Sequence, residues 1–81
     1  MQKMNTLPQD VIRGVAIITL MGRNGLHIEN FKSIIEYDEN IIKMRAKDSI
    51  ITVTGERLKV KSFNCEEINI TGIINEVKFG A

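Results

Sequence analysis

ITVTGERLKVKSF, from Ile51 to Phe63, and INITGIINEVKF, from Ile68 to Phe79, follow one pattern: an apolar strand ending in Gly, a brief turn, a second apolar strand and then Phe. The pattern occurs upstream in ITLMGRNGLHIENF, from Ile18 to Phe31, and without its glycine in SIIEYDENIIKM, from Ser33 to Met44. The turns are spaced by 17, 16 and 17 residues, at Gly22, Glu39, Gly55 and Gly72. This repeat indicates how the chain folds, and it carries no catalytic or metal-binding set of residues.

The composition favours a small β domain. The chain has 81 residues, of which 43% are apolar and only 5% aromatic, and isoleucine is the commonest apolar type. Branched side chains such as isoleucine pack well on a pleated sheet and lose rotamer freedom in a helix. A domain of this size buries only about 60 to 65% of the surface of its unfolded chain, so self-association or a partner is a plausible source of further burial.

Charge, cysteine content and the length of apolar stretches indicate the compartment and the kind of partner of the protein. A net charge of +1 creates no global field that would attract nucleic acid or an anionic membrane. The single Cys65 excludes an intramolecular disulfide and fits a reducing compartment. The longest apolar stretch, Val15 to Met21, is far shorter than the roughly 20 residues of a membrane span, and no secretory signal precedes it. We therefore expect a cytoplasmic protein.

The chain is expected to form one domain over residues 1–81, with residues 1–6 disordered and hairpins over residues 15–79. Pro8 followed by Asp10 and then Gly14 predicts a short helix over residues 8–13. From Val15 onward the apolar residues alternate, which is typical of strands. Turn residues between them predict eight strands, at residues 15–21, 26–31, 33–37, 41–46, 50–54, 58–63, 67–71 and 75–79.

Short connections favour an antiparallel meander of these eight strands, as a sandwich, a roll or a curved sheet. Because successive side chains alternate between faces, one side of the sheet is apolar and is expected to form the core, with Ile42, Met44, Ala46, Ile51, Val53, Leu58, Val60, Ile68 and Ile70. The strand from Val15 to Met21 is apolar on both faces, so the N-terminal helix or a neighbouring subunit should cover it.

A short β-solenoid is the alternative fold. A repeat of about 17 residues could be one rung of a parallel stack. We prefer the meander because solenoid rungs repeat their apolar ladder strictly, whereas one copy here has no glycine and another has Asn75 where the pattern has Leu.

The opposite side of the predicted sheet is basic and is the candidate interaction surface, with Lys43, Arg45, Lys47, Arg57, Lys59 and Lys61. It could be an ordinary solvated face, or it could contact an acidic protein or lipid headgroups. Nucleic acid is disfavoured, because no aromatic side chains are interleaved for base stacking.

The candidate chemistry is sparse. His27 shares a strand face with Glu29, beside Asn30, and a His-Glu pair could act as a general base, although no nucleophile or second base accompanies it. Cys65 beside two glutamates lacks the second Cys or the His of a metal site. The segment from Gly22 to Gly25 lacks the Lys-Ser/Thr end of a phosphate-binding loop, and Asn24-Gly25 suits a hairpin turn. We predict no catalytic residue, metal or cofactor.

Several segments together resemble the YabP/YqfC family of sporulation proteins, and most of all its YqfC branch. The most specific is LHIENFKSIIEY, from Leu26 to Tyr37, supported by LPQDV at Leu7 to Val11, ITLMG at Ile18 to Gly22, GERLKV at Gly55 to Val60 and INITGIINEVKF at Ile68 to Phe79. The resemblance implies expression in the mother cell of an endospore-forming bacterium and a role in late spore development. It also implies a membrane-anchored sporulation partner of the YqfD type.

These observations predict a non-enzymatic interaction or assembly protein that forms a homo-oligomer and binds such a partner. Its expected location is the mother-cell cytoplasm, with peripheral contact to the forespore membrane. The alternative is a small ligand-binding or enzymatic domain centred on His27, Glu29 and Asn30, which would require a concave pocket beside that strand.

Overall fold

The computed structural model describes residues 15–80, which form six β-strands and no helix. The strands are β1 (Ile17–Met21), β2 (Gly25–Glu29), β3 (Ser33–Tyr37), β4 (Ile41–Arg45), β5 (Ile50–Phe63) and β6 (Glu67–Gly80). All neighbours are antiparallel and form one sheet in the order β1-β2-β6-β5-β4-β3. The predicted antiparallel all-β class is confirmed, and the parallel stack of a solenoid is wrong. The predicted helix at residues 8–13 and the predicted disorder of residues 1–6 lie outside the described residues.

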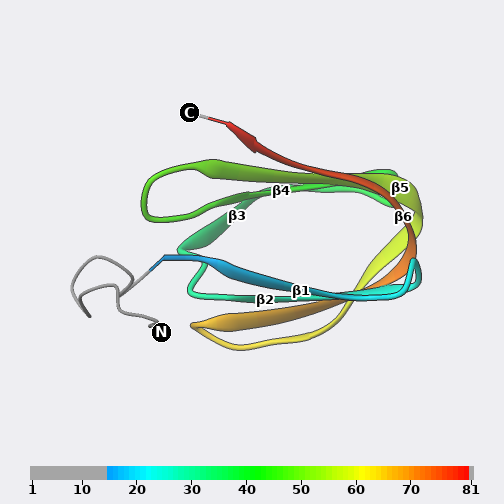
Figure 1. Cartoon of the computed structure of the whole chain (residues 1–81), viewed down its shortest axis with the longest axis horizontal. Helices are drawn as coiled ribbons and strands as arrows, with labels where there is room; N and C mark the ends of the chain where they lie inside the picture. The colour runs from blue at the N-terminus through cyan, green and yellow to red at the C-terminus, as the bar shows by residue number, and fades with distance from the viewer. Residues whose placement is uncertain (1–14, 81) are drawn as a thin grey trace, which may run out of the picture.

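The sheet doubles over on itself. β5 and β6 are 14 residues long each, pair along their lengths and bend near their middles (Figure 1). One half of this hairpin joins β1 and β2, because β2 pairs with residues 67–71 of β6. The other half joins β3 and β4, because β4 pairs with residues 50–54 of β5. We call these halves the β1 layer and the β3 layer.

The bends correct the strand prediction. Gly55 and Gly72, expected to end hairpin strands, lie inside β5 and β6, so four predicted strands merge into two and eight become six. The predicted simple meander is also wrong, since the chain crosses from β2 to β3 between layers and β2 pairs with β6. Glycine spacing alone does not distinguish a reversal of the chain from a bend within a strand, because both need an unhindered backbone.

Close backbone approach explains why glycine occupies both bends. A Cβ on Gly55 would overlap the carbonyl oxygen of Ile73, and one on Gly72 would lie 2.5 Å from the carbonyl oxygen of Arg57. Gly72 also has a φ of 129°, and Arg57 has a φ of 55° at a point where the ladder shifts register. Such bulges increase local twist and let a sheet turn a corner.

The two outer hairpin turns bond to the two bends. The Gly55 and Leu58 amides donate to the carbonyl oxygens of Asn40 and Glu39, at 3.0 and 2.8 Å. In the same way, the Gly72 and Ile74 amides donate to Asn24 and Arg23, at 3.3 and 2.7 Å. The repeat therefore has a structural meaning: two copies supply turns, and the other two supply the bends on which those turns lie.

The core lies between the two layers of the single sheet. Eight side chains are fully buried, namely Leu26, Ile28, Ile42, Met44, Ile51, Val53, Ile68 and Ile70. Phe31, Ala46, Leu58 and Ile74 complete the buried cluster. Every predicted core residue is buried except Val60, which is partly buried and packs against this cluster. Alternation therefore identified eight of the twelve buried side chains of this cluster, whereas Leu26, Ile28, Phe31 and Ile74 were not among the predicted core residues.

β1 differs from the other strands predicted to be buried, because most of its side chains are exposed. Its expected cover on both faces is not supplied by residues 15–80: Ile17, Leu20 and Met21 are 50%, 55% and 53% exposed. β1 pairs only with β2, so one of its edges is unpaired within the described sheet.

We expect Gly72→Ala to destabilise the protein far more than Gly22→Ala. Both residues have positive φ, but a Cβ at position 22 meets no atom within 4 Å, whereas at position 72 it meets backbone. Strain at positive φ costs about 1 to 2 kcal/mol, and a backbone clash adds to it, so Gly72→Ala should cost roughly 3 kcal/mol or more. Urea unfolding of both variants measures the difference.

A second matched pair tests the other bend. We expect Gly55→Ala to destabilise strongly, while Gly25→Ala stays within about 1 kcal/mol of the parent, since the new Cβ would meet mainly the flexible end of Met21. Equal unfolding free energies for Gly55→Ala and Gly25→Ala would contradict the close backbone approach.

Candidate interaction surfaces

The bend divides the predicted basic face into two groups. Lys43 and Arg45 lie on β4 in the β3 layer, whereas Lys59 and Lys61 lie on the second half of β5 in the β1 layer. Arg57 is exposed at the bend, and Lys47 follows β4 before the start of β5. Since the layers enclose the core between them, their outer faces point away from each other, and the six cations do not form one patch.

The two groups differ in their electrostatic surroundings. Nζ of Lys43 lies 3.9 Å from a carboxylate oxygen of Glu36 on the neighbouring strand β3. Lys61 lies at a register shift in β5, and Lys59 is opposite the uncharged Thr71 of β6. An exposed ion pair contributes little to stability, but it reduces the local positive potential around Lys43. Glu36 therefore offsets part of the charge of Lys43, whereas Lys59 has no carboxylate opposite it in the described sheet.

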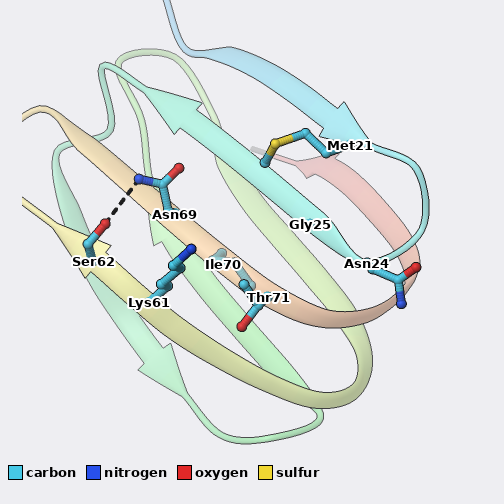
Figure 2. Close-up of a pocket in the computed structure, with 8 residues that line it drawn as sticks. All are labelled: Met21, Asn24, Gly25, Lys61, Ser62, Asn69, Ile70 and Thr71. Carbon is cyan, nitrogen blue, oxygen red and sulfur yellow. Dashed lines mark hydrogen bonds between the residues drawn. The ribbon is translucent and has the colours of Figure 1, made fainter.

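A row of polar side chains crosses the outer face of the β1 layer. Nδ2 of Asn69 donates to the Ser62 hydroxyl at 3.1 Å, shown as a dashed line in Figure 2. This orientation leaves Oδ1 of Asn69 to accept a hydrogen bond from Nδ1 of His27 at 2.7 Å. Nε2 of His27 then lies 3.6 Å from Glu67 and 3.9 Å from Glu29. The protonated imidazole would form ion pairs with both carboxylates.

The predicted His27 and Glu29 pair is thus brought together, while Asn30 is not part of it. Asn30 has a φ of 68°, and its amide donates to the carbonyl oxygen of Val15 at 3.0 Å, so it holds the backbone before β1. Sequence reasoning missed the partners Asn69 and Glu67, because only the pairing of β2 with β6, 42 residues apart at His27 and Asn69, places them there.

A hollow of about 470 Å³ lies next to this row. It is lined by Met21 of β1, Gly25 of β2 and Lys61 of β5 (Figure 2). Asn69 and Thr71 of β6 also line it, whereas none of His27, Glu29 and Asn30 does. The hollow is therefore beside the polar row and not centred on the predicted residues.

The open sides of the doubled sheet expose apolar side chains. Phe79 of β6 is 62% exposed and Phe63 of β5 is 63% exposed, although their cross-strand partners Ile51 and Ile68 point into the core. The layers approach on one side, where the Val60 amide donates to the Tyr37 hydroxyl at 3.0 Å. On the other side, β1 stays more than 8 Å from β6, measured between Cα atoms. The roll is therefore not closed into a barrel by strand pairing.

Three further features of the same part of the chain concern metal binding, membrane insertion and thiol chemistry. Residues 15–80 bring together no group of three or more His, Cys, Asp or Glu side chains arranged to hold a metal ion. They also include no helix of the length and apolarity that a membrane span needs. Cys65 is a free, exposed thiol.

Comparison with known proteins agrees with the sequence resemblance. The model of the YabP family matches residues 13–81 of the chain. The chain is also 29% identical over 73 residues to the uncharacterized protein YqfC of Bacillus subtilis (strain 168), covering 90% of this chain and 78% of that protein. The chain therefore belongs to the YabP family, which is associated with sporulation, and its predicted resemblance to YqfC is confirmed.

Proposed function

We propose that this protein is a non-enzymatic interaction protein of late endospore development that self-associates and binds a membrane-anchored sporulation partner of the YqfD type. It would act in the mother-cell cytoplasm, at the surface of the forespore membrane. The family's association with sporulation supports the process. The observation that carries the interaction role is the exposure of large apolar side chains along strands with unpaired edges.

Eight such side chains are exposed among residues 15–80, namely Val15, Ile17, Leu20, Met21, Ile35, Tyr37, Phe63 and Phe79. Single exposed apolar residues are normal on any protein. Here they lie on or just before β1, on β3 and at the ends of β5 and β6, beside backbone groups that have no strand partner within the described sheet. Exposed edges of this kind are where another chain adds to a sheet.

The basic side chains supply a second element of recognition. Lys59 and Lys61 lie on the second half of β5 in the β1 layer, and Lys61 also lines the hollow beside Gly25. Cations near a membrane surface are attracted to anionic headgroups and to acidic segments of membrane-associated proteins. We assign the partner or membrane contact to Lys59 and Lys61 in preference to Lys43 and Arg45, because Glu36 offsets part of the charge of Lys43.

The alternative function, a ligand-binding or enzymatic domain at His27, Glu29 and Asn30, has less support. Asn30 bonds to backbone, the nearby hollow is lined by none of the three residues, and Nδ1 of His27 is engaged by Asn69. A general base needs access to a substrate proton at hydrogen-bonding distance. We assign the polar row to cross-strand pairing of β2, β6 and β5, where such contacts stabilise a sheet.

A pull-down from sporulating cells with a tagged copy of the full chain tests the proposed function. We expect recovery of untagged copies of the chain together with a membrane-anchored sporulation protein, because both would bind exposed surfaces of the folded domain. Recovery of neither, from cells that produce the folded protein, would overturn the proposal.

Charge reversal tests the basic contact. We expect the double substitution Lys59→Glu and Lys61→Glu to weaken co-flotation with vesicles that contain anionic lipid, or capture of the membrane partner, by at least about tenfold, because each cation near such a surface contributes on the order of 1 kcal/mol. The matched control is Lys43→Glu with Arg45→Glu, which changes the net charge equally and should have a smaller effect. Equal effects of the two pairs would indicate a nonspecific charge response.

A further inference from the structure

Within residues 15–80, β1 is an edge strand without the usual protection against pairing. Natural edge strands are shielded by charged side chains, proline, bulges or cover from another element. The sequence of β1, IITLM, contains no charge and no proline, and its five residues pair with β2 without a register shift. Combined with the exposed side chains of Ile17, Leu20 and Met21, these features make β1 a template for a further strand.

The other unpaired edges of the described sheet are shielded. β3 has a register shift between Ile34 and Glu36 and carries that glutamate. The second half of β5 has Lys59 and Lys61 and a shift between Val60 and Ser62. The second half of β6 contains charged residues at Glu76 and Lys78. Among residues 15–80, the contrast singles out β1.

The alternation of backbone hydrogen bonds along β2 shows which backbone groups of β1 are unpaired in the described sheet. In β2, Asn24 accepts from Gly72 of β6 and the Asn30 amide donates to Glu66, so the even-numbered residues of this segment bond towards β6. Backbone groups alternate between the two edges of a strand, so His27 bonds towards β1 and its partner there is Thr19. Ile18 and Leu20 therefore direct their N–H and C=O groups to the open edge.

We propose that two copies of this chain pair antiparallel through β1 about a two-fold axis at Thr19, an inference that rests on the self-association in the proposed function. This register lets all five residues of β1 pair. Ile18 of each copy lies opposite Leu20 of the other, so the open groups of both residues form reciprocal hydrogen bonds. Thr19 faces Thr19 of the second copy as a non-hydrogen-bonded pair.

The side chains are self-complementary in this arrangement. Side chains opposite each other in an antiparallel pair share a face, so Ile17 would lie beside Met21 of the second copy on the outer face. Leu20 would lie beside Ile18 of the second copy on the inner face, since its own partner Leu26 points into the core. Thr-Thr pairs across a two-fold axis are favourable neighbours. The contact covers the three most exposed apolar side chains of β1.

Charge at the ends of β1 favours a second copy in the antiparallel direction. At the start of β1, Ile17 pairs with Glu29, which in turn pairs with Glu67. At its other end the hairpin turn carries Arg23. Antiparallel pairing brings the basic turn of one copy to the acidic end of the other, whereas parallel pairing would place the two arginines side by side. The isologous contact also closes on itself as a dimer.

Thr19→Lys tests the proposed edge. Light scattering coupled to size exclusion should show the parent chain as a dimer at micromolar concentration, and Thr19→Lys should raise the dissociation constant at least tenfold, because two ammonium groups would meet at the axis. Thr19 is exposed, so the variant should fold, which circular dichroism checks. The control Ile35→Lys places the same charge at an exposed apolar residue of β3 and should leave the dimer unchanged.

The outcomes separate the two proposals. If the parent chain associates and Thr19→Lys associates equally well, the β1 contact is wrong while self-association stands. If the parent chain is a monomer throughout, both the β1 contact and the self-association part of the proposed function are overturned.

Disulfide trapping tests the register. In a Cys65→Ser background, Thr19→Cys should form a covalent dimer under mild oxidation, since a non-hydrogen-bonded pair has its Cα atoms about 4.5 Å apart, within disulfide range. Met21→Cys in the same background is the control: it is exposed on the same face but lies opposite Ile17 of the second copy, so it should cross-link far more slowly. Equal cross-linking at both positions would contradict the antiparallel register.

Discussion

The rest of the structure depends on the close approach of two backbones at the bends of β5 and β6. At Gly55 and Gly72 the neighbouring strand comes so near that no Cβ fits. This approach lets a single long hairpin turn a corner and double the sheet over. The outer turns at Asn24 and Asn40 satisfy amides that the bulged ladder leaves without a partner. The bends and the turns therefore form one connected backbone network.

Doubling the sheet lets a short chain enclose a core. A flat antiparallel sheet of this size would bury one face only against another element. Here the two layers of one sheet supply both walls, and aliphatic side chains such as Ile28, Ile42 and Ile70 fill the space between them. The same solution creates open sides, because strand pairing joins the layers at the bend and not at their outer edges. Exposed apolar side chains on those edges follow directly from the architecture.

The candidate surfaces also result from this geometry. The bend directs the two groups of cations away from each other, so that Lys59 and Lys61 share a layer with β1 while Lys43 and Arg45 do not. Within the described sheet, β1 combines an unpaired edge with an uncharged apolar sequence, which suits strand addition by another chain. One layer of the domain thus offers both a self-complementary edge and the cations Lys59 and Lys61 to the proposed partners.

The sequence by itself determined the strand class, the family and most of the buried side chains of β4, β5 and β6, because side-chain alternation is a local property of each strand. Ile51 and Val53 were assigned to the core from their spacing alone, and they are fully buried. Only the tertiary structure decided that Gly55 and Gly72 bend strands instead of ending them, since that depends on Ile73 and Arg57 approaching from a different strand. It also decided which residues of different strands meet, because strand pairing and the bending of the sheet depend on residues far apart in the sequence. His27 therefore contacts Asn69, whereas Lys43 and Lys59 lie in different layers.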